Sequence, residues 1–195
     1  ILRASELQGS FDVSTMDVEV CEQPRLERVF YDGQRLAVRG GFDDDSVGCE
    51  NLSFEFQVCE AAEDGHLSFG VTTSNANFTC LVGRPTSSAD ERVFWIVDQF
   101  TYITLYLKWR AIPLLVQEGV VGRGLPIISP AVNAVSPGSA GSEITTYAPT
   151  PHLITDTNRS LFLEDDDYVG FDLRPDDHWA LRFFGPALAG RILYG

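Results

Sequence analysis

The sequence is dominated by short runs of β-branched and aromatic residues, and glycine, proline, aspartate or asparagine separates these runs about every 8–12 residues. A helical period of 3.6 residues is hard to find. In segment 52–59, LSFEFQVC, apolar and polar residues alternate, which predicts a half-buried antiparallel strand with one solvent-facing side. Segment 101–109, TYITLYLKW, carries apolar or aromatic residues on both faces and so predicts a central strand. The pattern as a whole favours an all-β fold.

The other candidate strands share this composition and the same kind of turn residues at their ends. With the two above, they are 10–20, 28–31, 35–40, 66–72, 78–83, 92–97, 113–117, 143–147, 152–155, 160–164, 168–173, 178–184 and 191–194. We therefore expect a single domain over residues 1–195, folded as an antiparallel β-sandwich or barrel-like structure of about a dozen strands.

Residues 118–142 depart from this pattern. The segment holds five glycines and three prolines among small apolar residues and has almost no charge. It cannot be a regular central strand, and it is long for a loop inside a compact domain. Two interpretations stay open: an arm that docks on a partner or a neighbouring copy, and an irregular loop folded back on its own sandwich.

The net charge restricts the kinds of partner. The formal charge is −14, from 28 acidic and 14 basic residues. Nucleic-acid binding requires a basic face, so this composition excludes a nucleic-acid partner. No apolar run reaches the ~18–20 residues that a membrane-spanning helix needs. Cation binding, or simple solubility, fits the charge better.

The cysteines and asparagines together indicate the secretory route. The four cysteines are even in number, and we expect two disulfides, Cys21–Cys49 and Cys59–Cys80, because each closes a modest loop. Glycosylation sequons begin at Asn51, Asn77 and Asn158. The chain begins at Ile1 without a signal peptide, as a processed chain or an excised domain would. The alternative is a reduced cytosolic protein whose sequons are coincidental.

Two acidic stretches, DDDSVG at 43–48 and DDDYVG at 165–170, are candidates for calcium binding. Alternate aspartates in an extended corner offer hard oxygen ligands on one side. Neither stretch has the register of an EF-hand loop, and a solvated acidic turn needs no metal, because aspartate favours turns through its own hydrogen bonds. The candidate calcium ligands are Asp43, Asp45, Glu164, Asp165, Asp167 and Asp172. No other cofactor is implied.

Catalytic motifs are absent from the sequence. The three histidines are scattered, no C-x-x-C pair occurs, and neither a G-x-S-x-G elbow nor a glycine-rich phosphate loop is present. Local pairs such as Asp64 with His66, or Asp176 or Asp177 with His178, fit polar strand edges. We expect a protein that is not an enzyme. Because carboxylate pairs are plentiful, a secreted hydrolase is the less favoured alternative.

Aromatic side chains on solvent-facing strands are the remaining candidates for ligand binding. Tyr102, Tyr106, Trp109 and Trp179 could stack on sugar rings, since amphipathic rings make large contacts at low entropic cost. The alternative is that they pack in the core or between sheets.

The stretch FEFQVCEAAEDGHLSFGV, residues 54–71, resembles the F-x-F-x-V…D-A-H-[IV]-x-L signature of the farnesoic acid O-methyltransferase-like domain. Phe54, Phe56, Val58, Asp64, His66 and Leu67 match that signature. Residues 94–97 and 181–195 look like later strands of the same family. The resemblance implies a small antiparallel β-sandwich found in extracellular proteins, and it implies no methyltransferase activity, because the chain has no G-x-G loop after a strand.

Two functions follow from these observations. The first is a non-enzymatic extracellular glycoprotein domain that recognises a glycan or a protein. The second is a self-assembling structural subunit of an extracellular filament, coat or viral capsid, in which the segment 118–142 and strand 10–20 exchange between copies.

Overall fold

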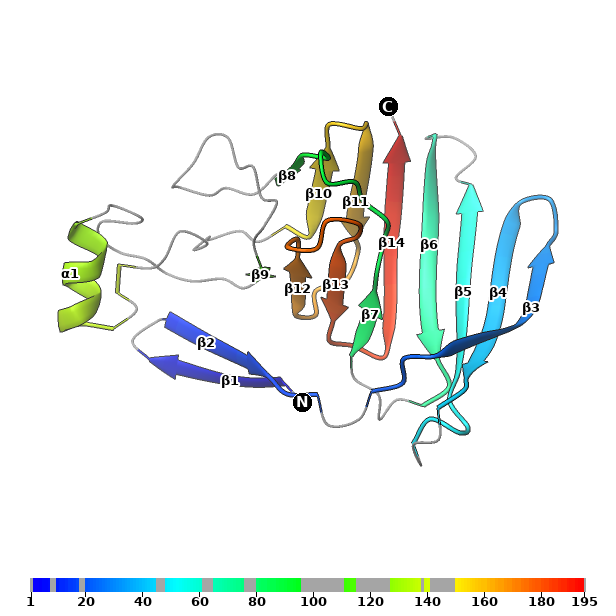
Figure 1. Ribbon diagram of the computed structural model, residues 1–195, viewed down its shortest axis with the longest axis horizontal. Helices are drawn as coiled ribbons and strands as arrows, with labels where there is room; N and C mark the ends of the chain where they lie inside the picture. Colours follow the sequence, from blue (N-terminus) through cyan, green and yellow to red (C-terminus); the bar gives the residue numbers. More distant parts are fainter. Residues whose placement is uncertain are drawn as a thin grey trace.

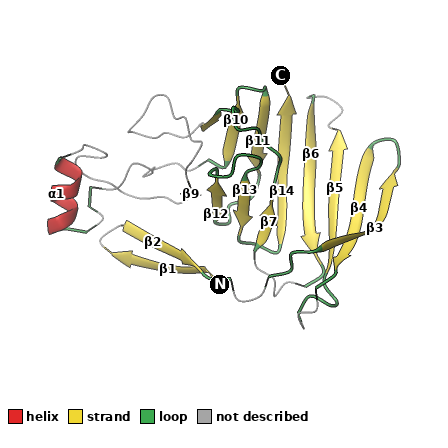
Figure 2. Cartoon of the chain, in the orientation of Figure 1, coloured by secondary structure: helices red, strands yellow, loops and turns green. Residues whose placement is uncertain are grey.

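The computed structural model describes residues 2–7, 10–17, 20–44, 48–60, 65–75, 80–95, 111–114, 127–137, 139–140 and 150–194. Over these ranges the chain forms fourteen strands and one helix, and every strand pair is antiparallel (Figures 1 and 2). The expected all-β antiparallel fold of about a dozen strands is confirmed.

The larger sheet has eight strands in the order β3-β4-β5-β6-β14-β11-β10-β8. Its strand order combines a meander of four consecutive strands, β3 to β6, with β14, β11, β10 and β8 from later in the chain. The bounds are β3 Pro24–Tyr31, β4 Arg35–Phe42, β5 Ser53–Glu60, β6 His66–Thr73, β14 Ala187–Tyr194, β11 Arg159–Leu163, β10 His152–Thr155 and β8 Val93–Trp95. β3 is the terminal strand, and its pairing with β4 shifts register between Leu26 and Arg28.

The smaller sheet has four strands in the order β7-β13-β12-β9. Its bounds are β7 Leu81–Gly83, β13 Ala180–Phe183, β12 Val169–Asp172 and β9 Ala111–Leu114. A separate hairpin joins β1 Leu2–Leu7 to β2 Ser10–Thr15. An exposed ion pair between Asp17 and Arg182 ties the end of this hairpin to β13, with 3.1 Å between Oδ2 and Nη2.

The hydrophobic core lies between the two sheets. Alternation decides which residues enter it: Leu161 and Leu163 of β11 point inward, as do Val169 and Phe171 of β12, while their neighbours are more exposed. The buried core comprises Val93, Leu153, Leu161, Leu163, Val169, Phe171, Leu173, Trp179, Leu181, Phe183 and Leu188. The smaller sheet lies in front of β10, β11 and β14, and β3, β4 and β5 extend beyond it (Figure 1).

Two glycines in the larger sheet make room for a phenylalanine on the strand beside them. Gly190 of β14 pairs with Phe69 of β6, and Gly40 of β4 pairs with Phe54 of β5. A Cβ at Gly190 would lie 2.7 Å from the Phe69 ring and 2.6 Å from the carbonyl oxygen of Phe162. A side chain at this position would therefore displace the ring or the backbone.

The segment 118–142 contains a helix, which neither interpretation of its sequence, a docking arm or an irregular loop, had included. Helix α1 spans Ile128–Val135. Pro130 is compatible with it because the first-turn N–H groups of a helix have no intrahelical partner, and Pro137 follows the helix end at Ser136. Ile127 and Val135 are more than four-fifths exposed.

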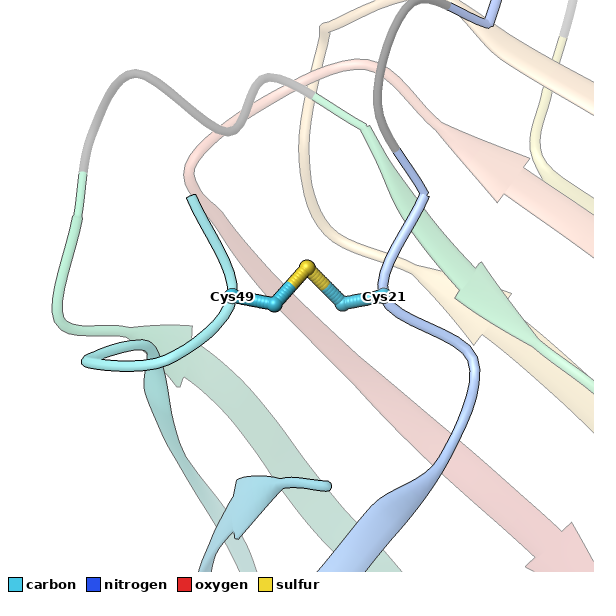
Figure 3. The surroundings of a disulfide bond; sticks show 2 residues. All are labelled: Cys21 and Cys49. Carbon is cyan, nitrogen blue, oxygen red and sulfur yellow. A yellow bond between two sulfur atoms is a disulfide. The ribbon is translucent and has the colours of Figure 1, made fainter. Parts of the chain in front are cut away.

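One of the two expected disulfides is present. Cys21 and Cys49 are bonded, with their Cα atoms 5.8 Å apart, and they join the segment before β3 to the turn before β5 (Figure 3). The second expected disulfide is wrong: Cys59 and Cys80 are free thiols. Cys59 lies on β5 of the larger sheet, which extends beyond the smaller sheet, whereas Cys80 leads into β7 of the smaller sheet (Figure 1).

Candidate functional site

An open hollow of about 500 Å³ lies where β11 leads into the second acidic stretch. It is lined by Thr150, Pro151, Phe162, Leu163, Glu164, Asp165 and Asp166. Phe162 occupies a half-buried position of β11, on the opposite side of the strand from the core residues Leu161 and Leu163. The edge of the His152 ring meets Phe162 at 5.6 Å between centroids. The hollow thus combines one aromatic ring with several carboxylates.

The carboxylates of this acidic stretch have different partners. Glu164 forms an ion pair with Arg191 at 2.6 Å, and Asp165 accepts a 2.7 Å hydrogen bond from the backbone N–H of Ala189. Asp166 is exposed and accepts no hydrogen bond from any described residue. Asp166 is therefore available to accept hydrogen bonds from the hydroxyl groups of a ligand in the hollow.

The remaining candidate calcium ligands do not converge. Asp172 is bound by the guanidinium of Arg174, whose hydrogen bond lowers the pKa of this carboxyl. Asp43 forms an ion pair with Arg25 at 2.5 Å. Within the described ranges, no three His, Cys, Asp or Glu side chains are placed to hold a metal ion. Asp45 lies outside the described residues, and calcium binding stays a prediction.

Of the four aromatic residues that could stack on a sugar, Trp179 is the one in the described part of the chain, and the expectation is wrong for it. Trp179 is only 4% exposed and belongs to the core, so its ring is not available for stacking on a ligand. The guanidinium of Arg159 lies 5.3 Å from the centre of this ring. Tyr102, Tyr106 and Trp109 lie outside the described residues.

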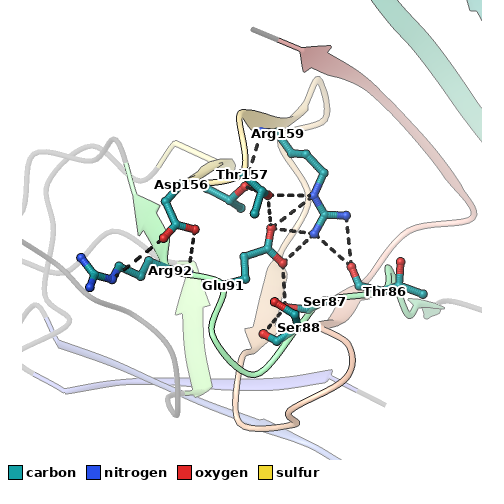
Figure 4. Close-up of polar contacts among 9 residues, drawn as sticks. Thr86, Ser87, Ser88, Glu91, Arg92, Asp156, Thr157 and Arg159 are labelled. Carbon is teal, nitrogen blue, oxygen red and sulfur yellow. Dashed lines mark hydrogen bonds and ion pairs between the residues drawn. The ribbon is translucent and has the colours of Figure 1, made fainter.

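An ion pair with a buried carboxylate links Glu91, in the loop between β7 and β8, to Arg159 at the start of β11 (Figure 4). Glu91 is 2% exposed, and both of its carboxylate oxygens lie 2.6 Å from Nη2 of Arg159. Thr157 and Ser87 donate further hydrogen bonds at 2.7 and 2.8 Å. Arg159 also donates to the carbonyl oxygen of Thr86.

The pKa of Glu91 reflects these contacts. Burial of the carboxylate opposes ionisation, but the hydrogen bonds from Arg159, Thr157 and Ser87 outweigh it and lower the pKa to about 2. Glu91 is thus a charged, buried carboxylate whose two oxygens are both occupied by partners within the protein.

Two histidines make contacts of the kind found in catalytic dyads. Nε2 of His152 lies 2.6 Å from Oγ of Ser160, and burial lowers the pKa of His152. No carboxylate among the described residues bonds the second ring nitrogen, so this pair lacks the orienting acid of a triad. The expected local pair of His178 and Asp177 is present at 2.7 Å on the surface. Asp64 lies outside the described residues.

Two of the three sequons are described, and both lie in exposed turns. Asn51 is in the turn before β5, close to the disulfide at Cys49. Asn158 is in the turn between β10 and β11 and has a φ of 59°, a left-handed conformation that asparagine tolerates well. Glycosylation at these positions stays a prediction. Asn77 lies outside the described residues.

Phe162 and His152 were not among the candidate ligand-binding residues. The signal was available in segment 160–164, where Ser160 and Phe162 alternate with two leucines and a run of acidic residues follows. An aromatic residue at the non-core position of a strand, directly before several carboxylates, is a pattern to search for.

No helix in the described part of the chain has the length and hydropathy needed to cross a bilayer. No protein-family model matches this chain, and no curated protein matches its sequence.

Three solved structures that align with this chain are glycoside hydrolases of family GH31. A GH31 sulfoquinovosidase from E. rectale, in complex with an aza-sugar inhibitor, aligns with all of this chain and 27% of its own, at a TM-score of 0.80 and 16% identity. A GH31 dextranase from Flavobacterium johnsoniae aligns with 100% of this chain and 19% of its own, with a TM-score of 0.40 and 10% identity.

A GH31 α-xylosidase from a soil metagenome aligns with 98% of this chain and 31% of its own, with a TM-score of 0.41 and 10% identity. At such identities the likeness is one of fold, and of these three structures the sulfoquinovosidase is similar enough to compare. This chain spans about a quarter of that enzyme's length.

Proposed function

We propose that this chain is a non-catalytic carbohydrate-binding module of a secreted protein that processes carbohydrates. The observation that carries the proposal is the alignment of the whole chain with 27% of a GH31 sulfoquinovosidase at a TM-score of 0.80. That fold therefore occurs as one part of a much longer sugar-cleaving enzyme. The disulfide Cys21–Cys49 supports an oxidising compartment.

The hollow beside Phe162 is the proposed contact with sugar. Sugar rings have apolar faces that pack on aromatic rings and hydroxyl groups that donate to carboxylates. Phe162 supplies the ring, and Asp166 supplies a carboxylate that no described residue occupies. The acidic lining of the hollow favours neutral sugars over sulfated or sulfonated ones, because like charges repel.

The test is a titration of the chain with glucose, xylose and isomaltotriose, followed by heteronuclear NMR. We expect millimolar binding that shifts resonances of β11 and the following acidic stretch. Phe162→Ala should weaken binding at least tenfold. The matched control is Phe30→Ala, which removes an exposed ring of β3 on the terminal strand. Absence of binding to all three sugars, or equal weakening by both variants, would contradict the proposal.

An assay with nitrophenyl glycosides separates binding from catalysis. We expect no release of nitrophenol above the buffer rate. Release that depends on Glu164, tested with Glu164→Gln, would instead identify a hydrolase. Glu164 already forms an ion pair with Arg191 at 2.6 Å, so one of its carboxylate oxygens has a partner within the protein.

A further inference from the structure

One face of the larger sheet continues the hydrophobic core beyond the smaller sheet. The register places Val29, Val38, Phe56 and Val71 in one row that ends at the core residue Leu188. A second row runs through Tyr31, Leu36, Val58 and Phe69 to Gly190 and Leu163. Both rows run from the terminal strand β3 into the core.

Exposure rises along these rows. Leu188 is 6% exposed and Leu163 is 1% exposed, whereas Leu36 is 37%, Val29 is 61% and Tyr31 is 67% exposed. Val38, Phe56 and Val58 are half-buried. We call Val29, Tyr31, Leu36, Val38, Phe56 and Val58 the open apolar face. Contiguous apolar surface of this kind marks interaction sites.

The opposite face of the same strands is more polar, although Phe30 and Ala37 also lie on it. The alternate positions of β3, β4 and β5 carry Arg28, Arg39 and Glu55, and Arg39 forms an ion pair with Glu55 across the strands. Such alternation places the polar side in water and the apolar side against another layer. Among the described residues, the smaller sheet provides that layer over β6, β14, β11 and β10, where the core residues of the larger sheet lie.

We propose that a second folded domain of the same polypeptide covers the open apolar face. This inference rests on the part of the proposed function that places the chain in a longer protein, and it does not depend on sugar binding. The similar fold in the sulfoquinovosidase is 27% of a longer chain. A second copy fits less well, because each copy carries a net charge of −14 and two copies repel one another.

The experiment measures the solvent access of two consecutive residues that point to opposite faces of β3. Val29→Cys reports on the open apolar face, and Arg28→Cys is the matched control on the polar face. Both are made in a Cys59→Ser, Cys80→Ser background so that no native thiol reacts. Maleimide labelling rates are compared between the 195-residue chain and the longest polypeptide that its gene encodes.

We expect the Val29→Cys rate to fall at least tenfold in the longer polypeptide and the Arg28→Cys rate to change less than twofold. Leu36→Cys repeats the measurement if Val29→Cys fails to fold. Equal rates in both polypeptides, or equal protection of both faces, would overturn the proposal. So would a gene product that consists of this chain alone. Protection that grows with the concentration of the 195-residue chain, together with a dimer in sedimentation, would overturn it in favour of a second copy.

If the chain binds no sugar but Val29→Cys is still protected in the longer polypeptide, only the carbohydrate part of the proposed function is contradicted. If the chain binds sugar but Val29→Cys is not protected, only the domain interface is contradicted. The two proposals therefore fail separately.

Discussion

Nη2 of Arg159 lies 2.6 Å from each carboxylate oxygen of Glu91, and the same guanidinium sits over the ring of Trp179. This one side chain joins the loop that precedes β8, the turn before β11 and the core beneath them. The effect of this contact on the stability of the fold can be measured, because Glu91 is almost fully buried and its pKa is far from the usual value.

Stability should fall in acid because Glu91 must be protonated. Its pKa is about 2 in the folded protein, against 4.5 for an ordinary glutamate. A lowered folded-state pKa stabilises the protein above pH 4.5, and this contribution is lost as the pH falls towards 2. Allowing for screening by solvent, we expect it to be about 1–2 kcal/mol. Urea unfolding at pH 6 and pH 3 measures it, and Glu91→Gln should reduce the difference between the two. An unchanged difference in the variant would contradict the assignment.

Removal of Arg159 should cost far more than removal of an exposed arginine. Arg159→Ala leaves a buried carboxylate without its ion pair, and we expect a loss of about 3 kcal/mol. Arg159→Lys keeps the charge but loses the bidentate contact with the carboxylate, so the loss of stability should be intermediate. The matched control is Arg182→Ala, which breaks the exposed pair with Asp17 and should cost less than ~1 kcal/mol. Comparable losses for Arg159→Ala and Arg182→Ala would show that the buried pair contributes little.

The disulfide should contribute substantially to stability. Cys21 and Cys49 are 28 residues apart. A disulfide that closes a loop of this size restricts the unfolded chain and is expected to stabilise the folded protein by about 3–4 kcal/mol. We expect the double variant Cys21→Ser, Cys49→Ser to lose this amount in denaturant unfolding, and the double variant Cys59→Ser, Cys80→Ser to lose less than half of it. Thiol titration of the unfolded, unreduced protein should find two thiols; four or none would contradict the assignment.

Substitution of Gly190 should destabilise the larger sheet. A Cβ there meets the Phe69 ring and a backbone carbonyl oxygen, which cannot move cheaply. We expect Gly190→Ala to cost about 1–3 kcal/mol. Gly170→Ala, in β12, is the control, because nothing lies within 4 Å of the added Cβ. Thermal unfolding of both variants checks the prediction, and equal midpoints would refute it.

The sequence predicted most of the strands because their alternation is local information. Segment 152–155 matches β10 at both ends, and segment 66–72 differs from β6 by one residue. β1, at Leu2–Leu7, was not predicted, since charged residues interrupt its apolar pattern. β14 begins four residues earlier than predicted, because Gly190 looks like a turn residue until Phe69 is seen against it.

The parts that could not be predicted depend on how the sheets are assembled. Cys59 and Cys80 are close enough in sequence to pair, but their strands belong to different sheets. Trp179 looked like an exposed aromatic residue and lies in the core, where Arg159 meets its ring. The hollow at Phe162 brings together residues 150–151 and 162–166 from both sides of a hairpin. The resemblance to the farnesoic acid O-methyltransferase-like domain stays a prediction.

The terminal position of β3 has a consequence for how this protein behaves at high concentration. A flat, unpaired strand edge is a template on which further chains can add until amyloid forms. β3 begins with Pro24, which has no N–H to donate, and its ladder shifts register between Leu26 and Arg28. Arg25 and Glu27 add charge on either side of Leu26. These irregularities interrupt the even row of donors and acceptors that an incoming strand needs, so the sheet stops growing at β3.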